Sequence, residues 1–253
     1  MTTSAHPATE LHFHALHGVD DGPESLDESV DLLRAAAADG TGTVVATPHV
    51  RGDFLTDVWQ AHDGVLELTE ALTSAAVNVR VRPGAELGHD MVGRLSQTEL
   101  DAVAQGPPGA RWLLVEAPFV AIDETFHAAT EELRDRGFSV IVAHPERSAD
   151  AALDGSAGLR RELAAGSLAQ VNAQSVCGGH GRDAHQAALA LIAEGLVSVI
   201  SSDAHGPSRP PLLREARARL IEEGFDPRVG FALTQGGPGR LLRRGILRDA
   251  LVA

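Results

Sequence analysis

The chain has 253 residues and a formal net charge of −14 at pH 7, with 35 acidic and 21 basic side chains. Every basic side chain is arginine, because the sequence contains no lysine. The acidic balance argues against a general nucleic-acid binder, which neutralises phosphates with cationic side chains, and the absence of lysine excludes Schiff-base chemistry and a Walker-type phosphate loop.

The same composition limits where the protein is expected to work. No stretch reaches the roughly 18 consecutive apolar residues that a membrane span needs. The opening MTTSAHPATE has no basic region followed by an apolar run, so it does not predict a secretory signal. Cys177 is the only cysteine, which excludes an internal disulfide and a cysteine-rich zinc site. We therefore expect a cytoplasmic protein without membrane insertion.

Seven short β-rich runs alternate with segments of helical character, which predicts a largely parallel α/β fold. Helices are expected over 24–40, 123–137 and 210–224, each ending at a glycine, and the first carries acidic residues in its first turns. Residues 1–9 are expected to form a flexible tail. The seven runs are Glu10–His14, Thr43–Thr47, Val77–Val81, Trp112–Glu116, Ser139–His144, Leu168–Ala173 and Val197–Ser201.

Imidazoles and carboxylates recur where these runs end. His12 and His14 close the first run, and alternation along a strand would point both rings to the same side. Further ligand types follow or end five of the other runs: His49, Glu86, Glu116, His144, Asp203 and His205. A single carboxylate at a strand end is more often a helix cap or a loop contact. Because barrel-like α/β folds collect the carboxyl ends of their strands on one face, the recurrence predicts a metal site.

Several segments together resemble a known family. In order, HFHALHGVDDGPESLDES, ATPH, GAE, AHPERS and SSDAHGPSRPP resemble the PHP (polymerase and histidinol phosphatase) superfamily. Within it they are closest to the CpsB/CapC/YwqE group of bacterial capsule-type protein-tyrosine phosphatases. The resemblance runs from about Glu10 to Leu242. It implies one PHP-type domain over residues 1–253, with the family's fold, a distorted TIM-like barrel of seven β/α units.

The resemblance also implies a ligand set for three metal ions. It assigns the first metal to His12, His14, Glu86 and Asp203. Glu86 would bridge to a second metal, which Glu116 and His144 also bind. The third metal would be bound by Asp21, His49 and His205, with Asp20 as a neighbour or partner of a ligand. Arg147 and Arg209 match the arginines that contact the substrate phosphate in the family.

The chemistry of these residue types agrees with that assignment. A mixed set of imidazoles and carboxylates suits Mn²⁺, Zn²⁺ or Fe²⁺ better than Ca²⁺ or Mg²⁺, and we expect two or three ions, with Mn²⁺ preferred. Adjacent metals lower the pKa of a bound water, and arginine has a planar fork that matches phosphate. We expect phosphotyrosine hydrolysis by direct attack of a metal-bound hydroxide, without a phospho-enzyme. A metal-bound water or, less favoured, His17 would protonate the leaving group.

One segment partly matches the motif of a different class of phosphatase. VCGGHGR, over Val176–Arg182, is similar to the cysteine phosphatase loop, but only four residues separate Cys177 from Arg182 where that loop needs five. We therefore interpret Cys177 as a small apolar residue. Two departures from the family pattern concern Glu10, where the family often has aspartate, and Ser148, where it often has an aromatic that could stack on a phosphotyrosine ring.

The sequence is compatible with several functions. The leading hypothesis is a tyrosine phosphatase acting on a bacterial tyrosine kinase that controls capsule or exopolysaccharide synthesis, and the family's oligomers make a homo-oligomer compatible with it. A small-molecule phosphomonoesterase such as histidinol phosphatase would use the same metals. A degenerate PHP module that only binds a partner would lack ligands, and a non-phosphatase metallohydrolase would not need the paired arginines. The short loops after the first, fifth and seventh runs favour an open site and a protein substrate.

Overall fold

The strands form two sheets in which every pairing is parallel. The computed structural model describes residues 7–55, 57–153 and 156–247. One sheet has the order β1-β2-β4, formed by Ala8–Glu10, Thr41–Ala46 and Arg80–Pro83. The other has the order β3-β5-β6-β7-β8-β9, formed by His49–Val50, Glu86–Leu87, Trp112–Glu116, Ser139–Ala143, Leu168–Asn172 and Val199–Ser201. The α/β class expected from the sequence is therefore confirmed.

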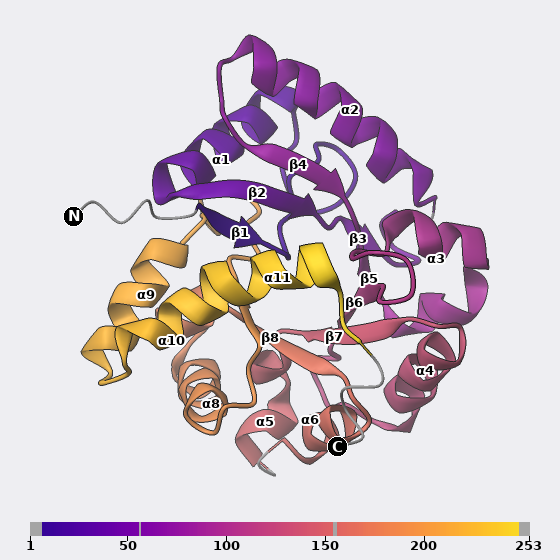
Figure 1. Ribbon diagram of the computed structural model, residues 1–253, viewed down its shortest axis with the longest axis vertical. Coiled ribbons are helices and arrows are strands. Elements are labelled where there is room, and N and C mark those ends of the chain that lie inside the picture. Colours follow the sequence, from indigo (N-terminus) through magenta and orange to yellow (C-terminus); the bar gives the residue numbers. More distant parts are fainter. Residues whose placement is uncertain (1–6, 56, 154–155, 248–253) are drawn as a thin grey trace.

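Helices connect most of these strands and lie around them (Figure 1). The α-helices are α1 Leu26–Asp39, α2 Trp59–Ser74, α3 Gln97–Val103, α4 Glu124–Asp135, α5 Ala149–Leu153, α6 Ala157–Ala164, α7 Ala173–Val176, α8 Arg182–Ala193, α9 Leu213–Glu222, α10 Pro227–Phe231 and α11 Gly237–Arg244. The structure also contains the 3-10 helices η1 His89–Arg94 and η2 Pro145–Arg147 and the π-helix η3 Ala232–Gly236. Among the described residues, no helix is long and apolar enough to cross a membrane.

The predicted runs locate the strands, with shifts at their ends. Trp112–Glu116 coincides with β6, and the run at Ser139 is β7 without its last histidine. The first run was wrong in its bounds, because β1 already ends at Glu10 and the two histidines follow it. The run at Val77 was also displaced, since residues 77–79 only connect α2 to β4. Strand ends are set by pairing with neighbours, which local residue preferences do not determine.

The expected tail over residues 1–9 extends too far. Ala8 and Thr9 belong to β1, and both are buried. Pairing with β2 brings Ala8 opposite Thr41 and Glu10 opposite Val44, so the first strand is part of a sheet. Residues 1–6 lie outside the described part of the chain.

Local capping explains where the predicted helices begin and end. The Ser25 hydroxyl accepts a hydrogen bond from the Glu28 backbone N–H at the start of α1, and Gly40 closes that helix with φ +99°. At α4, the Asp123 carboxylate accepts hydrogen bonds from the N–H groups of Thr125 and Phe126. These caps fix the point at which the chain turns back toward the sheets.

An apolar cluster lies between the two sheets and is closed at one end by the last helix. It contains residues of β2, β6, β7 and β9, together with Leu241 from α11 and Ile246, which follows it. The Trp112 indole N–H donates to the Leu241 carbonyl at 3.2 Å, which fixes α11 to the start of β6. Figure 1 shows α11 crossing in front of the strands. Because the starts of the strands face α11, their carboxyl ends lie on the far side.

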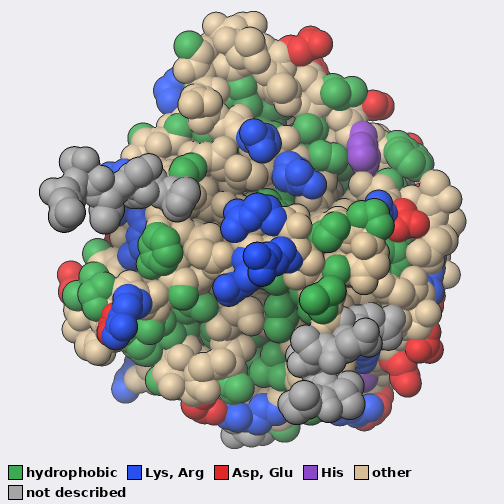
Figure 2. Space-filling view, viewed as in Figure 1, with side chains coloured by type: hydrophobic (Ala, Val, Ile, Leu, Met, Phe, Trp, Pro, Cys, Tyr) green, Lys and Arg blue, Asp and Glu red, His purple; other side chains and the backbone are tan. Residues whose placement is uncertain are grey.

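The face on which α11 lies is basic. Figure 2 shows a band of basic side chains running from β4 to α11 across this face. The exposed arginines of these two elements are Arg80, Arg82, Arg240, Arg243 and Arg244. This face thus carries a group of basic side chains on a chain whose formal net charge is −14.

Candidate metal centre

The polar side chains predicted at the strand ends converge at the carboxyl ends of the strands. His12 and His14 follow β1, whereas His49 and Glu86 are the first residues of the short strands β3 and β5. The others end or follow β6, β7 and β9, namely Glu116, His144, Asp203 and His205. The parallel register aligns His49 with Glu86, shortly after β2 and β4 end, and aligns Glu116 with Ala143, the residue before His144. These four side chains are thereby brought to the same cluster.

Hydrogen bonds orient the first two imidazoles. His12 Nδ1 lies 2.9 Å from Gln170 Oε1, and the Gln170 amide N–H donates to Asn172 Oδ1, which leaves Oε1 as an acceptor. His14 Nδ1 lies 2.7 Å from Asp20 Oδ2. Both rings are therefore assigned a proton on Nδ1, so each presents the lone pair of Nε2 to the interior.

Four electron-rich groups meet at one point. His12 Nε2 and His14 Nε2 lie 3.2 Å apart. Each is also 3.1–3.3 Å from Glu86 Oε2 and from Asp203 Oδ1. Although imidazole nitrogens surround it, Glu86 Oε2 has no hydrogen-bond partner in the described structure. Lone pairs that face one another without a donor between them fit a bound cation.

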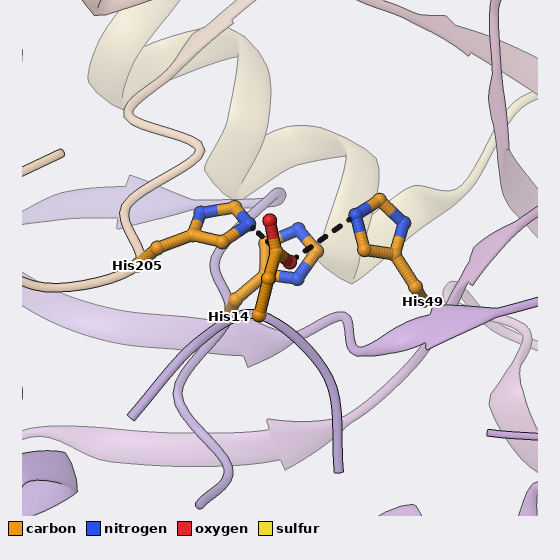
Figure 3. A group of neighbouring side chains, drawn as sticks. His14, His49 and His205 are labelled. Atoms are coloured by element: carbon orange, nitrogen blue, oxygen red, sulfur yellow. Dashed lines mark ion pairs between the residues drawn. The ribbon is translucent and has the colours of Figure 1, made fainter. Parts of the chain in front are cut away.

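A second group shares His14 with the first. Figure 3 shows the rings of His49 and His205 on either side of a carboxylate, with His14 beside it. His205 Nε2 is 3.1 Å and His49 Nε2 is 3.6 Å from Asp21 Oδ1. The His205 Nδ1 hydrogen bonds to the Asp203 carbonyl at 2.9 Å, so its Nε2 is available to a ligand, and among the described residues that atom has no hydrogen-bond partner. The ligand atoms of this group lie within 4.8 Å of one another.

The third group differs in one member from the sequence expectation. Glu86 and Glu116 lie together with His49, and one ligand atom of each falls within 4.8 Å of the others. The sequence placed His144 with these two carboxylates, and in the structure His144 Nε2 is 2.9 Å from Glu86 Oε1. Arg51 donates to both oxygens of Glu116, at 3.0 and 3.2 Å. Glu116 therefore has a guanidinium partner that the sequence did not indicate.

Two of these residues adopt a backbone conformation that is rare outside glycine. His144, directly after β7, has φ +35°, and Asp203, two residues after the end of β9, has φ +52°. Left-handed backbone at a non-glycine residue costs roughly 1–3 kcal/mol, and such residues cluster at functional sites. The turn bends each side chain from the strand direction toward Glu86 or His12. The strain therefore serves the geometry of the cluster.

The two arginines predicted to contact phosphate lie at the rim of the cluster. Arg209 donates to Asp203 Oδ2 at 2.7 Å, and Arg147 donates to the same atom at 3.4 Å. The Asn172 amide also donates to this oxygen, at 2.7 Å. Asp203 thus turns one oxygen to the imidazoles and the other to the guanidinium groups. An anion between the arginines would lie next to the cluster.

Charge–charge contacts determine the protonation of the cluster. Burial by itself raises the pKa of Glu86, but the imidazoles of His12, His14 and His144 outweigh it and hold the pKa well below its usual range. Burial likewise raises the pKa of Asp203, and His12, His14 and Arg209 bring it well below its usual value. Burial lowers the pKa of His14, yet Asp20 and the other carboxylates raise it well above normal. The ionised form of both carboxylates is therefore favoured by the imidazoles around them.

Two residues that the sequence analysis considered for catalysis lie outside the three groups of ligands. The side chain of His17 is 30% exposed and its nearest charged partner is Glu67 of α2, at 4.0 Å. Cys177 ends α7 and packs against the largest apolar cluster. Burial raises the pKa of the Cys177 thiol to about 12, so it carries no thiolate at neutral pH.

Comparison with known proteins agrees with this geometry. The family model for capsular polysaccharide synthesis, CpsB/CapC, matches residues 8–243. The chain belongs to the CpsB/CapC family. CapC of Staphylococcus aureus, named as a putative tyrosine-protein phosphatase, is 29% identical over 211 residues, which cover 81% of this chain and 80% of that protein. The tyrosine-protein phosphatase YwqE of Bacillus subtilis is 24% identical over 241 residues, which cover 95% and 94% of the two chains.

A solved structure of the same family shares the fold. A structure from the work described as crystal structures of YwqE of Bacillus subtilis and CpsB of Streptococcus pneumoniae, metal-dependent tyrosine phosphatases, superposes with a TM-score of 0.82 at 24% sequence identity. The superposition covers 94% of this chain and 96% of that one. The resemblance expected from the histidine and aspartate motifs is therefore confirmed at the level of the family.

Proposed function

We propose that this CpsB/CapC family member is a metal-dependent protein-tyrosine phosphatase. The observation that carries the proposal is the convergence of buried imidazole and carboxylate lone pairs beside two arginines. The ligand groups support a divalent cation site, and the arginines support a phosphate substrate. The relatives YwqE and CpsB, named as tyrosine phosphatases, support phosphotyrosine as the substrate.

The proposed ligands are those that the family resemblance implies. His12, His14, Glu86 and Asp203 would hold one ion, and Glu86 would bridge to a second ion at Glu116 and His144. Asp21, His49 and His205 would hold a third. The orphaned Glu86 Oε2 and His205 Nε2 support this assignment, because each needs a partner that the described residues do not provide. We propose two or three ions, with Mn²⁺ preferred and Zn²⁺ or Fe²⁺ as alternatives.

The chain itself binds and orients the substrate. Divalent metals at this site would supply a water of lowered pKa as the nucleophile and would polarise the phosphoryl oxygens. Arg147 and Arg209 would bind the phosphoryl oxygens that face away from the ligands, because the planar guanidinium group matches the geometry of phosphate. Asp203 holds both guanidinium groups in place before substrate binds. Gln170 and Asp20 would keep the His12 and His14 lone pairs directed at the ions.

We further propose that the two sheets together form the distorted seven-unit barrel of PHP proteins. An isolated parallel bridge between Phe13 and Ala204 links the segment after β1 with the segment after β9. The apolar cluster that both sheets share supports the same arrangement. Phosphotyrosine on a bacterial kinase of capsule or exopolysaccharide synthesis is the proposed physiological target, with the protein in the cytoplasm.

Metal removal tests the proposal. Phosphate release from a phosphotyrosyl peptide is measured after treatment with a chelator and again after Mn²⁺ is restored. We expect the chelated protein to lose at least about 100-fold in activity and the restored protein to recover it, because the nucleophile depends on the metal. Full activity in the chelated protein would contradict the proposal.

The Cys177→Ser variant separates the two phosphatase mechanisms. A metal-dependent enzyme should keep its kcat with this variant, since the half-buried thiol lies outside the proposed ligand set. The matched comparison is His12→Ala, which removes a proposed ligand and should abolish Mn²⁺-dependent phosphate release. An inactive Cys177→Ser protein of native stability would overturn the metal mechanism.

A further inference from the structure

The cavity at the candidate metal centre carries aromatic surface as well as charge. Its volume is about 250 Å³, and its lining includes His49, Phe54, Phe119, His144, Arg147 and Arg209. Among these lining residues, the two phenylalanines are the large apolar side chains. Phe54 is 37% exposed and Phe119 is 48% exposed, so both present ring surface to a ligand in this cavity.

Phe119 is held between a proposed metal ligand and a proposed phosphate-binding arginine. Its ring stacks on His144 with centroids 5.9 Å apart and an interplanar angle of 2°. The guanidinium carbon of Arg147 lies 4.8 Å from the ring centroid, within range of a cation–π contact. A phosphate on Arg147 would therefore place its ester substituent beside Phe119.

Phe54 has the same kind of surroundings on another side of the cavity. Its ring stacks on His49 with centroids 5.3 Å apart and an interplanar angle of 14°. Arg51 lies 5.4 Å from the ring centroid. Hydrogen bonds from the Phe54 N–H to the Arg51 carbonyl and from the Leu55 N–H to the His49 carbonyl fix the turn that carries the ring. Each phenylalanine is thus packed on a ligand imidazole and has another part exposed.

The loop of Phe119 is anchored by the residue at which this chain departs from the family pattern. The Ser148 hydroxyl donates to the Pro118 carbonyl at 2.5 Å. The next backbone N–H, that of Ala149, donates to the Phe119 carbonyl at 2.8 Å. Ser148 therefore offers no ring to a substrate but holds in place a neighbouring loop that does.

We propose that Phe54 and Phe119 form an aryl-binding subsite, which receives the aromatic ring of a phosphate monoester while Arg147 and Arg209 bind its phosphate. This inference rests on the proposed phosphatase function, and it names the residues that would select aryl phosphates as substrates. In an aryl phosphate the ring is bonded directly to the ester oxygen, so it must lie next to the phosphate. An alkyl phosphate such as phosphoserine places only a methylene group there and leaves both phenylalanines uncovered.

The size of the effect follows from ordinary aromatic contacts. An aromatic pair contributes about two- to tenfold in binding beyond the area it buries, so two pairs favour an aryl ligand by about tenfold or more.

Two phosphonates that differ only in the ring test the subsite. Binding of phenylphosphonate and of methylphosphonate to the Mn²⁺-loaded protein is measured by calorimetry for the natural chain and for Phe54→Leu, Phe119→Leu and the double variant. Leucine keeps the apolar character but removes the aromatic face. We expect the double variant to bind phenylphosphonate about tenfold more weakly and methylphosphonate within about twofold of the natural chain.

Phe231→Leu is the matched control, because Phe231 lies in α10 outside the cavity lining and is 47% exposed. It should change neither dissociation constant. If the double variant bound both phosphonates equally more weakly, the subsite would be overturned. The phenylalanines would then only hold the ligand imidazoles in place. Unchanged phenylphosphonate binding, in a protein that hydrolyses phosphotyrosine, would overturn the subsite alone. A metal-loaded natural chain that neither hydrolyses phosphotyrosine nor binds either phosphonate would overturn the subsite and the proposed function together.

Discussion

Asp20 shows how one carboxylate positions two imidazoles of the candidate metal centre. Its Oδ2 lies 2.7 Å from His14 Nδ1 and also accepts the His49 backbone N–H at 3.0 Å. Its Oδ1 accepts the Gly22 N–H at 3.0 Å. A side chain at Gly22 would meet both Asp20 and the His14 carbonyl at 3.0 Å, so the glycine leaves room for this contact. The second aspartate, Asp21, remains able to face His49 and His205.

Replacing Asp20 with asparagine should weaken metal binding while the fold persists. The variant removes the charge that stabilises the orientation and basicity of His14, and removal of such a partner typically costs about 10- to 100-fold in metal affinity. Calorimetric titration of the chelated protein with Mn²⁺ measures this affinity. Asp101→Asn is the control, because Asp101 pairs with Arg111 away from the ligand groups. Equal Mn²⁺ affinity in Asp20→Asn and the natural chain would contradict the orienting role.

The sequence predicted the convergence of ligand types but not their partners. The sequence predicts this cluster because a parallel α/β fold brings successive strand ends together, and imidazole and carboxylate residues recur at those ends. Gln170, Asn172 and Arg51 were not identified, since their roles depend on distances that span up to 158 positions along the chain, as between Gln170 and His12. The exposed faces of Phe54 and Phe119 were likewise not predictable, because a phenylalanine after a strand usually packs into the core.

At the scale of elements, a buried carboxylate joins two helices on the outside of the fold. Glu162 of α6 is only 1% exposed and lies against α4. Its oxygens accept from Thr130 at 2.8 Å and Arg134 at 3.0 Å, and its Oε1 lies 2.6 Å from His127 Nδ1. Burial by itself raises the pKa of Glu162, but these donors and Ser167 bring it below its usual value.

Glu162→Gln should therefore destabilise the protein in a pH-dependent way. Because the folded-state pKa of Glu162 is lowered, its stabilising effect is present above the unfolded pKa of about 4.3 and is lost as pH falls through the folded pKa. We expect the variant to lose about 1.5–3 kcal/mol of unfolding free energy at pH 7, the usual contribution of hydrogen bonds to a charged group, and a smaller amount near pH 4.

Urea unfolding at both pH values, with the same chelator present, measures this difference. Glu131→Gln is the control, since Glu131 lies exposed on α4 and its replacement should change stability little at either pH. A decrease in stability in Glu162→Gln that is equal at the two pH values would contradict the ionised network.

Predictability also differs among elements. Runs of buried apolar residues such as β6 and β7 were found with correct starts, and the capped helices α1 and α4 were found with their ends. The two-residue strands β3 and β5 were not predicted. They are strands only because His49 pairs with Glu86 and Glu86 pairs with Leu114, and such pairing has no local signal. These short strands nevertheless carry two of the proposed ligands.

For the whole molecule, the last helix closes the apolar interior opposite the metal centre. Leu241 of α11 is 8% exposed and packs with residues of both sheets. The hydrogen bond from Trp112 to its carbonyl and the bond from the Ile246 N–H to the Ala110 carbonyl fix this end of the chain to β6. The segment from η3 to α11 is thus part of the core and not an appendage.

Leu241→Ala should lower the unfolding free energy by about 2–4 kcal/mol, because it leaves a cavity in the apolar interior. Chemical unfolding followed by tryptophan fluorescence measures the change, since buried Trp112 adjoins the site of substitution. Leu247→Ala is the control, because Leu247 is 61% exposed and should change stability by less than about 0.5 kcal/mol. A smaller decrease for Leu241 than for Leu247 would contradict a closing role for α11.

We propose that the metal centre hydrolyses phosphotyrosine in preference to small-molecule phosphates. The most direct measurement compares kcat/KM for a phosphotyrosyl peptide and for histidinol phosphate with the same Mn²⁺-loaded protein. We expect a clear preference for the peptide, because the arginines and the two phenylalanines together fit an aryl phosphate. A preference for histidinol phosphate would contradict the tyrosine phosphatase and would leave a metal centre that serves small-molecule metabolism.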